Sequence, residues 1–137
     1  GKVLSCLGRR NNNPLIENPF IPSYVSMNGQ EVYKFAVNTV PASIQKVLEL
    51  AGLETGDIKY FVLHQANIRI LQAVAKRLKA DMEKFPVSLD HCGNISAASV
   101  PILLDEMNRK GMLEKGDKIV MSGFGGGLTW ASAVLEW

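Results

Sequence analysis

The sequence predicts an α/β domain, in which strands and amphipathic helices alternate along the chain. Four consecutive apolar or aromatic residues at 60–63 have the composition of a buried strand, and a helical pattern begins after Asn67. Another helical segment and two strand-like segments complete the chain. Ligands gather at the carboxyl ends of strands in open α/β sheets, so His64, the first residue after the buried strand, is the first functional candidate.

Length and composition predict a single domain. The chain has 137 residues, of which 47% are hydrophobic and 20% charged, and this is enough apolar material for one core. The net charge of +2 is too small to predict nucleic-acid binding. No apolar run could span a membrane and no full signal-peptide core begins the chain, so we expect a cytoplasmic protein without a membrane partner. Cys6 and Cys92 lie far apart and predict free thiols, neither a disulfide framework nor a metal site.

Residues 1–26 predict an irregular lead-in or linker with at most a short strand at 3–7, because its prolines exclude a long helix. These prolines are Pro14, Pro19 and Pro22. From Gln30 to about residue 51 the apolar spacing is helical, and Pro41 predicts a break or kink near residues 39–41. Gly52 suits the position after a helix C-terminus.

The helix after Asn67 has the clearest amphipathic pattern. Its apolar side carries Leu71, Val74, Ala75 and Leu78. The opposite side is polar and mostly basic, with Arg69, Gln72, Lys76 and Lys79, and with Arg77 at its margin. A solvated helix face is the ordinary explanation of such a basic stripe, and an acidic partner is the functional one. Asn67 itself is predicted to be the N-cap of the helix.

The second half predicts a strand at residues 85–89, a helix capped by Ser96, and a helix end at Gly111. The final strands are expected at 118–121 and 129–137, joined by the glycine-rich segment 122–128.

The triple glycine at 125–127 is not followed by Lys-Ser/Thr or by a helix, which excludes a phosphate-binding loop. Two explanations stay open: a flexible hairpin turn, or a bare backbone that donates N–H groups to an oxyanion. If the loops carrying His64, Asn94 and these glycines converge, they form a site for acyl chemistry without a nucleophile.

Three segments, HQANIRI, GNISAAS and GFGGGLTWASAVLEW, in this order, closely resemble the C-terminal half of β-ketoacyl-acyl carrier protein synthase III, in the thiolase-like superfamily. The resemblance runs from about Met27 to Trp137, so we expect a domain at 27–137 after the lead-in 1–26. It implies a mixed sheet, mostly parallel with an antiparallel C-terminal strand, flanked by helices. It also implies a homodimeric acyltransferase of fatty acid biosynthesis that condenses an acyl-CoA with malonyl-acyl carrier protein, without a cofactor or metal.

The resemblance implies a role for several residues around the strand ends. His64 and Asn94 would be two members of a Cys-His-Asn triad that binds the thioester carbonyl and stabilises the enolate formed by decarboxylation. Asn67 would contact the pantetheine arm, and Phe124 would border the active site. Gly126 would help to form the oxyanion hole.

The resemblance also supplies a partner for the basic stripe, since Arg69, Lys76 and Arg77 match the surface that receives acidic acyl carrier protein. The nucleophilic cysteine of the family is absent, because it belongs to the N-terminal half. Cys6 has no helix to lower its pKa, and Cys92 does not match the nucleophile's position. We therefore expect no condensation by this chain alone, and an N-terminal half bearing the cysteine as its partner within a longer protein.

Other readings stay open. A non-catalytic carrier-docking module would need the basic stripe but not His64, and a polyketide-type condensing enzyme would have similar motifs. A thiol hydrolase built on Cys92 with His64 is a further alternative. The missing half could also be a separate chain, or the exposed apolar face could be covered by self-association. The acyl primer is not fixed by these residues.

Overall fold

A computed structural model of the chain describes residues 3–6, 15 and 24–137. Its main sheet has three strands in the order β3-β4-β5, with bounds Tyr60–Leu63, Lys118–Gly125 and Thr129–Glu136. β3 and β4 run parallel, and β4 and β5 run antiparallel. The predicted mixed sheet with an antiparallel C-terminal strand is therefore confirmed.

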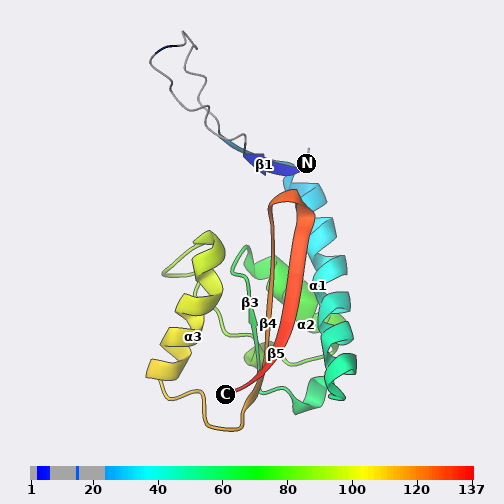
Figure 1. The fold of residues 1–137 in the computed structure, drawn as a ribbon, viewed down its shortest axis with the longest axis vertical. Helices are drawn as coiled ribbons and strands as arrows, with labels where there is room; N and C mark the ends of the chain where they lie inside the picture. The colour runs from blue at the N-terminus through cyan, green and yellow to red at the C-terminus, as the bar shows by residue number, and fades with distance from the viewer. Residues whose placement is uncertain (1–2, 7–14, 16–23) are drawn as a thin grey trace.

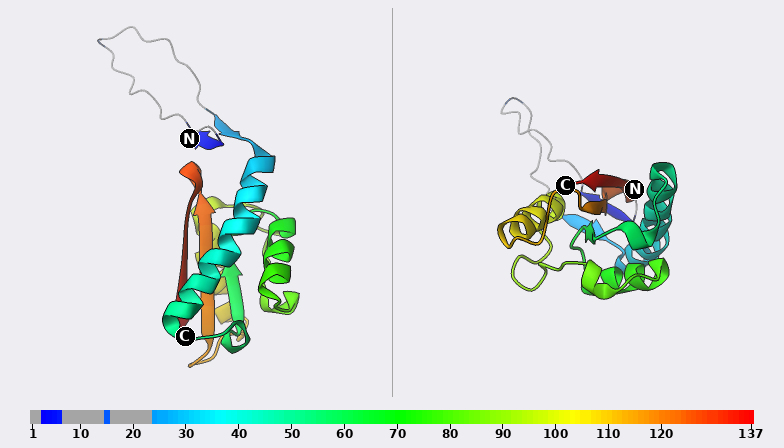
Figure 2. Two further views of the ribbon diagram at one scale, coloured as in Figure 1. Left: turned by 90° about the vertical axis from the view of Figure 1, so that its right-hand side faces the viewer. Right: turned by 90° about the horizontal axis from the view of Figure 1, so that it is seen from below.

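Helices cover both faces of this sheet. The helices α1 (Gly29–Ala51) and α2 (Ile68–Leu78) lie on one side and α3 (Ser99–Arg109) on the other (Figure 1), as the view along the strands also shows (Figure 2). The predicted α/β architecture with flanking helices is thus confirmed.

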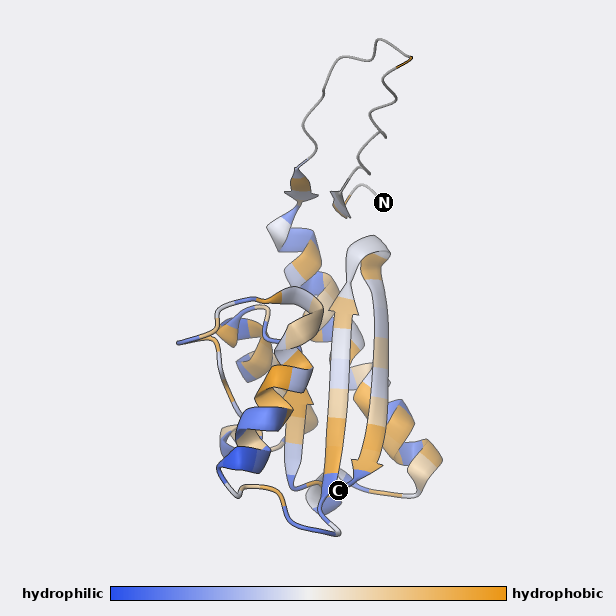
Figure 3. Ribbon diagram, turned by 60° about the vertical axis from the view of Figure 1, so that its left-hand side comes forward, coloured by the Kyte–Doolittle hydropathy of each residue, from blue (hydrophilic) through white to orange (hydrophobic). Residues whose placement is uncertain are grey.

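The strands alternate their side chains between two hydrophobic clusters, as a pleated sheet requires. Phe61, Leu63 and Val120 pack in the cluster with α1 and α2. Val62 and Ile119 pack in the cluster with α3. Hydrophobic residues are concentrated in the halves of β4 and β5 away from their hairpin (Figure 3). The half near the hairpin contains the glycines and small polar residues of the two strands, together with the aromatic residues Phe124 and Trp130.

A second sheet pairs β1 (Leu4–Cys6) with β2 (Val25–Met27) in antiparallel register. The short strand predicted near the N-terminus is confirmed by β1, whereas β2 was not predicted. β1 packs against η4 (Gly126–Leu128), the 3₁₀ turn that joins β4 to β5. The prolines of the predicted lead-in lie outside the described residues, and the division of the chain after residue 26 stays a prediction.

The sequence predicted a break or a kink near residues 39–41. One continuous helix, α1, runs through Pro41, so a break is wrong, whereas a kink stays a prediction. Pro41 is buried and cannot donate to the carbonyl of Val37. The helix continues because its buried face runs through the proline, with Val40 and Ile44 on either side of it. Gly52 follows the helix with φ of +66°, as predicted. Neither α1 nor any other helix in the described ranges is long and apolar enough to cross a membrane.

The strand expected at residues 85–89 is wrong, because this segment has no ladder partner in the described part of the chain. The side chain of Gln65, which is fully buried, takes the place of a neighbouring strand. Its Oε1 accepts a hydrogen bond from the Ser88 N–H at 3.1 Å, and its Nε2 donates to the Pro86 carbonyl at 3.4 Å. Pro86 also lacks the N–H that a ladder would use.

The N-terminus of α3 differs from the prediction as well. A short 3₁₀ turn, η3 (Ser96–Ala98), precedes the helix, and Ala98 occupies the cap position without a side-chain hydrogen bond. The predicted Ser96 cap is therefore wrong. The end of α3 agrees with the sequence, since Gly111 follows the helix with φ of +67°.

Candidate active site

A cavity of about 740 Å³ lies at the carboxyl ends of β3 and β4. It is lined by all five residues that the sequence placed near the acyl chemistry: His64, Asn67, Asn94, Phe124 and Gly126. Because β3 and β4 are parallel, the segments that follow them emerge at one edge of the sheet. The sequence left open whether the loops carrying His64, Asn94 and the glycines converge, and in the structure all three line one cavity.

His64 lies directly after β3 and is held from three sides. Its backbone N–H donates to the Ser122 carbonyl at 2.8 Å, which continues the pairing with β4. Its Nδ1 lies 2.7 Å from the Ser99 Oγ. Its ring packs edge to face on Phe124, with a centroid distance of 5.3 Å and an interplanar angle of 78°.

The contacts of Ser99 favour a proton on the Nδ1 of His64. Ser99 is 1% exposed, and its hydroxyl donates to the Ser96 carbonyl at 2.9 Å. A hydroxyl has a single proton, so while this bond is made Oγ can only accept from His64, and the ring is protonated at Nδ1. Nε2 then keeps its lone pair, and it has no hydrogen-bond partner among the described residues.

Burial keeps the His64 ring neutral. The pKa of His64 is lowered from its ordinary value because burial disfavours the charged imidazolium. A neutral ring with a free Nε2 can accept a proton at neutral pH.

Asn94 reaches the cavity from the loop before α3. Its Oδ1 accepts a hydrogen bond from the Ser96 N–H at 3.0 Å, which fixes the side chain and leaves its amide N–H groups free of partners in the described ranges. Gly93 precedes it with φ of +64°, a conformation that favours glycine. The loop therefore presents an amide donor with a defined orientation.

The glycine-rich segment is a hairpin turn that also lines the cavity. β4 ends at Gly125, which pairs with Thr129, and Gly127 between them has φ of +75°. Among the described residues, no heavy atom outside its immediate neighbours lies within 4 Å of where a Gly126 Cβ would be. Gly126 thus exposes bare backbone at the cavity. The segment is a hairpin turn, as one of the two explanations required, and the oxyanion role of its N–H groups stays a prediction.

Asn67 caps α2 as predicted, since its side chain accepts from the Arg69 N–H at 2.8 Å. The apolar side of α2 is buried, as predicted, and includes Leu71, Val74, Ala75 and Leu78. The three residues of the basic stripe assigned to the carrier, Arg69, Lys76 and Arg77, are exposed and form no ion pair with any described residue. Their charges are available to an acidic partner.

Cys92 has no hydrogen bond to His64 among the described residues. Its sulfur is 3.8 Å from the Glu106 Oε1, and it does not line the cavity. Burial, and then the charge of Glu106, raise the pKa of the Cys92 thiol. A raised pKa disfavours the thiolate, so the structure gives no support to a hydrolase that pairs Cys92 with His64.

Ser99 is the site residue that the sequence analysis missed. The signal was present, because Ser99 closes the GNISAAS motif that was singled out for Asn94. Its partner lies 35 residues earlier in the chain, and one sequence does not show that contact.

Residues 48–137 match the family model of the 3-oxoacyl-[acyl-carrier-protein (ACP)] synthase III C terminal. The β-ketoacyl-[acyl-carrier-protein] synthase III of Clostridium acetobutylicum is 53% identical over 88% of this chain and 37% of its own length. A crystal structure of 3-oxoacyl-(acyl carrier protein) synthase III from Pseudomonas aeruginosa matches with a TM-score of 0.89 at 35% identity, over 98% of this chain and 41% of that one. The priming β-ketosynthase of a polyketide biosynthetic pathway matches with a TM-score of 0.86 at 33% identity, over 98% and 40%. The chain thus spans less than half the length of these relatives.

Proposed function

The chain belongs to the 3-oxoacyl-[acyl-carrier-protein] synthase III family, and from this premise we propose that it is the C-terminal catalytic half of such a synthase. It would support the decarboxylative Claisen condensation of an acyl-CoA with malonyl-acyl carrier protein in fatty acid biosynthesis. The observation that carries the proposal is the convergence of His64, Asn94 and Gly126 on one cavity at the sheet edge.

His64 and Asn94 would act on the oxygen atoms of the thioesters. The Nε2 of neutral His64 accepts the thiol proton of the nucleophilic cysteine, which then attacks the acyl-CoA carbonyl and expels the CoA thiolate. The ring, now protonated at Nε2, donates to the malonyl thioester oxygen together with the Asn94 amide. The bond to the carboxylate then breaks, CO2 leaves, and the electron pair of that bond forms an enolate that these donors stabilise.

The enolate carbon then attacks the acyl-cysteine carbonyl, and the new carbon–carbon bond gives a tetrahedral oxyanion. The cysteine sulfur leaves as this oxyanion collapses and takes back the proton held by His64. The Gly126 N–H supports this step by donating to the oxyanion. Phe124 packs against His64 and borders the cavity, and Asn67 at its rim would contact the pantetheine arm.

The cysteine would come from an N-terminal half, which we propose as the partner of this chain within a longer, homodimeric protein. Large apolar side chains support this, because Val25 is 70% exposed, Met27 59% and Trp130 53%. Val25 and Met27 also line the cavity, so a covering partner would close it.

The test is reconstitution. The chain alone should form no acetoacetyl-carrier from acetyl-CoA and malonyl-acyl carrier protein, and co-expression with a cysteine-bearing N-terminal half should restore the product. Within the reconstituted pair, Asn94→Ala should lower kcat by about 100- to 1000-fold, the usual cost of losing one oxyanion donor. Product from the chain alone, or an Asn94→Ala pair with unchanged kcat, would refute the proposal.

We propose that the basic stripe binds acidic acyl carrier protein, because Arg69, Lys76 and Arg77 are exposed and unpaired in the described part of the chain. The double change Arg69→Glu and Lys76→Glu should abolish carrier binding in a titration followed by NMR, while His64→Ala should leave it intact. Lys115→Glu, in the turn before β4, makes a charge reversal outside the stripe and should have little effect. Equal losses in both charge variants would show a non-specific charge effect.

A carrier-docking module without catalysis is the second candidate, and the unpaired stripe favours it. It predicts normal carrier binding and no product even with the N-terminal half present.

A polyketide-type condensation is favoured by the similarity to the priming β-ketosynthase. Comparing acyl-CoA primers in the reconstituted pair would separate it from fatty acid initiation.

A further inference from the structure

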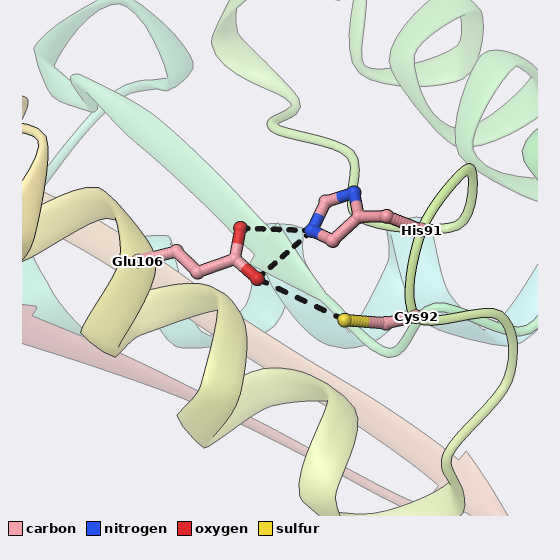
Figure 4. A group of neighbouring side chains, drawn as sticks. All are labelled: His91, Cys92 and Glu106. Carbon is pink, nitrogen blue, oxygen red and sulfur yellow. Dashed lines mark hydrogen bonds and ion pairs between the residues drawn. The ribbon is translucent and has the colours of Figure 1, made fainter.

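Outside the cavity, three potential metal ligands meet between a turn and the helix α3. His91 and Cys92 lie in the turn at 89–92, and Glu106 lies on α3. Their ligand atoms all lie within 4.8 Å of one another. The three side chains point toward a common centre (Figure 4), and none of them lines the cavity.

We propose that His91, Cys92 and Glu106 bind a zinc ion. An imidazole nitrogen, a thiolate sulfur and a carboxylate oxygen are the donor types that zinc prefers, and water would complete a tetrahedron. Zinc bond lengths place tetrahedral donors about 3.5 Å apart. The Glu106 Oε1 lies 2.9 Å from the His91 Nε2 and 3.8 Å from the Cys92 sulfur, and all three ligand atoms lie within 4.8 Å of one another, so side-chain shifts of about 1 Å would admit the ion.

Asp90 gives the cluster a supporting feature of zinc sites. Its Oδ1 lies 2.8 Å from the His91 Nδ1. A carboxylate in this position holds the proton on Nδ1 and directs the lone pair of Nε2 toward the metal. Nε2 is the nitrogen that faces Glu106, so the tautomer favoured by Asp90 is the one that the proposed site needs.

Lys110 is the competing cation. Its Nζ lies 3.4 Å from the Glu106 Oε2, so the ammonium shares the carboxylate that would bind zinc. The same contacts also fit a hydrogen-bonded charge cluster without metal. The two explanations differ in the response to removing Lys110: a metal site becomes stronger, whereas a charge cluster loses one of its partners.

A bound zinc ion would hold the turn at 89–92 in place against α3. It would join the turn to α3 across 14 residues of chain. Asn94 lies two residues after Cys92, so zinc would fix the loop that brings this side chain to the cavity. The zinc site itself does not depend on the proposed condensing function.

The test uses metal-free chain titrated with Zn²⁺ against a chromophoric chelator, and with Co²⁺ followed by its absorption. We expect one Zn²⁺ per chain and a thiolate-to-cobalt charge-transfer band. Asp90→Asn should weaken Zn²⁺ binding by about 10- to 100-fold, the usual cost of losing a supporting carboxylate, and should keep the band. Cys92→Ser and His91→Ala should weaken binding more, and Cys92→Ser should remove the band. Lys110→Gln should tighten binding.

Cys6→Ser is the matched control for the thiol and should change neither stoichiometry nor band. Circular dichroism checks that each variant is folded, and protection of Cys92 from alkylation by Zn²⁺ gives a second readout in unaltered protein. A band that persists in Cys92→Ser, tight binding that is equal in all variants, or no Zn²⁺ binding at micromolar concentration would overturn the site and leave a charge cluster only.

Discussion

Replacing Ser99 by Ala tests whether its hydroxyl organises the candidate site. The Ser99 Oγ is the hydrogen-bond partner of His64 at 2.7 Å and accepts from the Gln65 N–H at 3.3 Å. Ala keeps the volume of the Cβ and removes all of these contacts. The Ser96 carbonyl, which loses its donor, belongs to an exposed residue and can bond to water instead.

The loss of stability expected in Ser99→Ala depends on which hydrogen-bond partners of the hydroxyl stay buried. Gln65 is fully buried, so its N–H is left without an acceptor at a cost of about 1–2 kcal/mol. His64 is half-buried and loses one hydrogen bond, worth about 1 kcal/mol. The free energy of unfolding should therefore fall by about 2–3 kcal/mol in Ser99→Ala.

Ser88 offers a matched control, because it is also 1% exposed. Its Oγ has no hydrogen-bond partner among the described residues, so Ser88→Ala removes an unsatisfied buried hydroxyl and should stabilise the fold by about 1 kcal/mol. With a urea m-value of about 1.5 kcal/mol/M, the midpoints of the two variants should differ by about 2–3 M.

Urea unfolding followed by circular dichroism measures this difference, and ¹⁵N NMR of the imidazoles measures the tautomer of His64. In the unaltered chain the proton should lie on Nδ1, and Ser99→Ala should shift it toward Nε2. Equal midpoints for the two Ser→Ala variants, or an unchanged tautomer in Ser99→Ala, would refute the role given to Ser99.

Three more predictions concern single residues. His64 should titrate below 6.5 in a ¹H NMR pH series, because burial lowers its pKa. The unfolded chain then binds this proton more readily than the folded chain, so the free energy of unfolding should fall as pH drops through 6.5. The variant His64→Gln should show a weaker pH dependence of stability. Gly127→Ala should cost about 1 kcal/mol in thermal unfolding because φ there is +75°, whereas Gly126→Ala has open space and should cost little; equal costs would contradict this. Metal-free Cys92 should react with iodoacetamide more slowly than a free thiol, since burial raises its pKa, and faster labelling would revive a nucleophilic role.

Local chemistry explains which parts of the fold the sequence predicted. β3, the cap at Asn67 and the turn at Gly52 each follow from a few adjacent residues, and the structure has all three. The break at Pro41 and the strand at 85–89 failed because distant residues changed the outcome. Packing of the buried face carries α1 through the proline, and the amide of Gln65 replaces a strand partner.

The sequence allowed us to predict which residues line the candidate site, but not which hydrogen bonds these residues make. His64, Asn94 and Gly126 stand out because each follows a strand or loop signal within a recognisable motif, and all three line the cavity. The contact of His64 with Ser99 and that of Cys92 with Glu106 join separate elements, and periodicity along one sequence carries no information about them.

The HQAN segment contains both residues that line the cavity and a residue that holds the fold together. His64 and Asn67 line the cavity, but Gln65 between them is buried and binds Pro86 and Ser88. Its side chain thus ties the segment that leads toward Asn94 to the end of β3. The Gln65 N–H also donates to Ser99, the residue that holds the His64 ring. A change at Gln65 would therefore disturb both sides of the site without touching a substrate, and its effect on activity should be accompanied by a loss of stability.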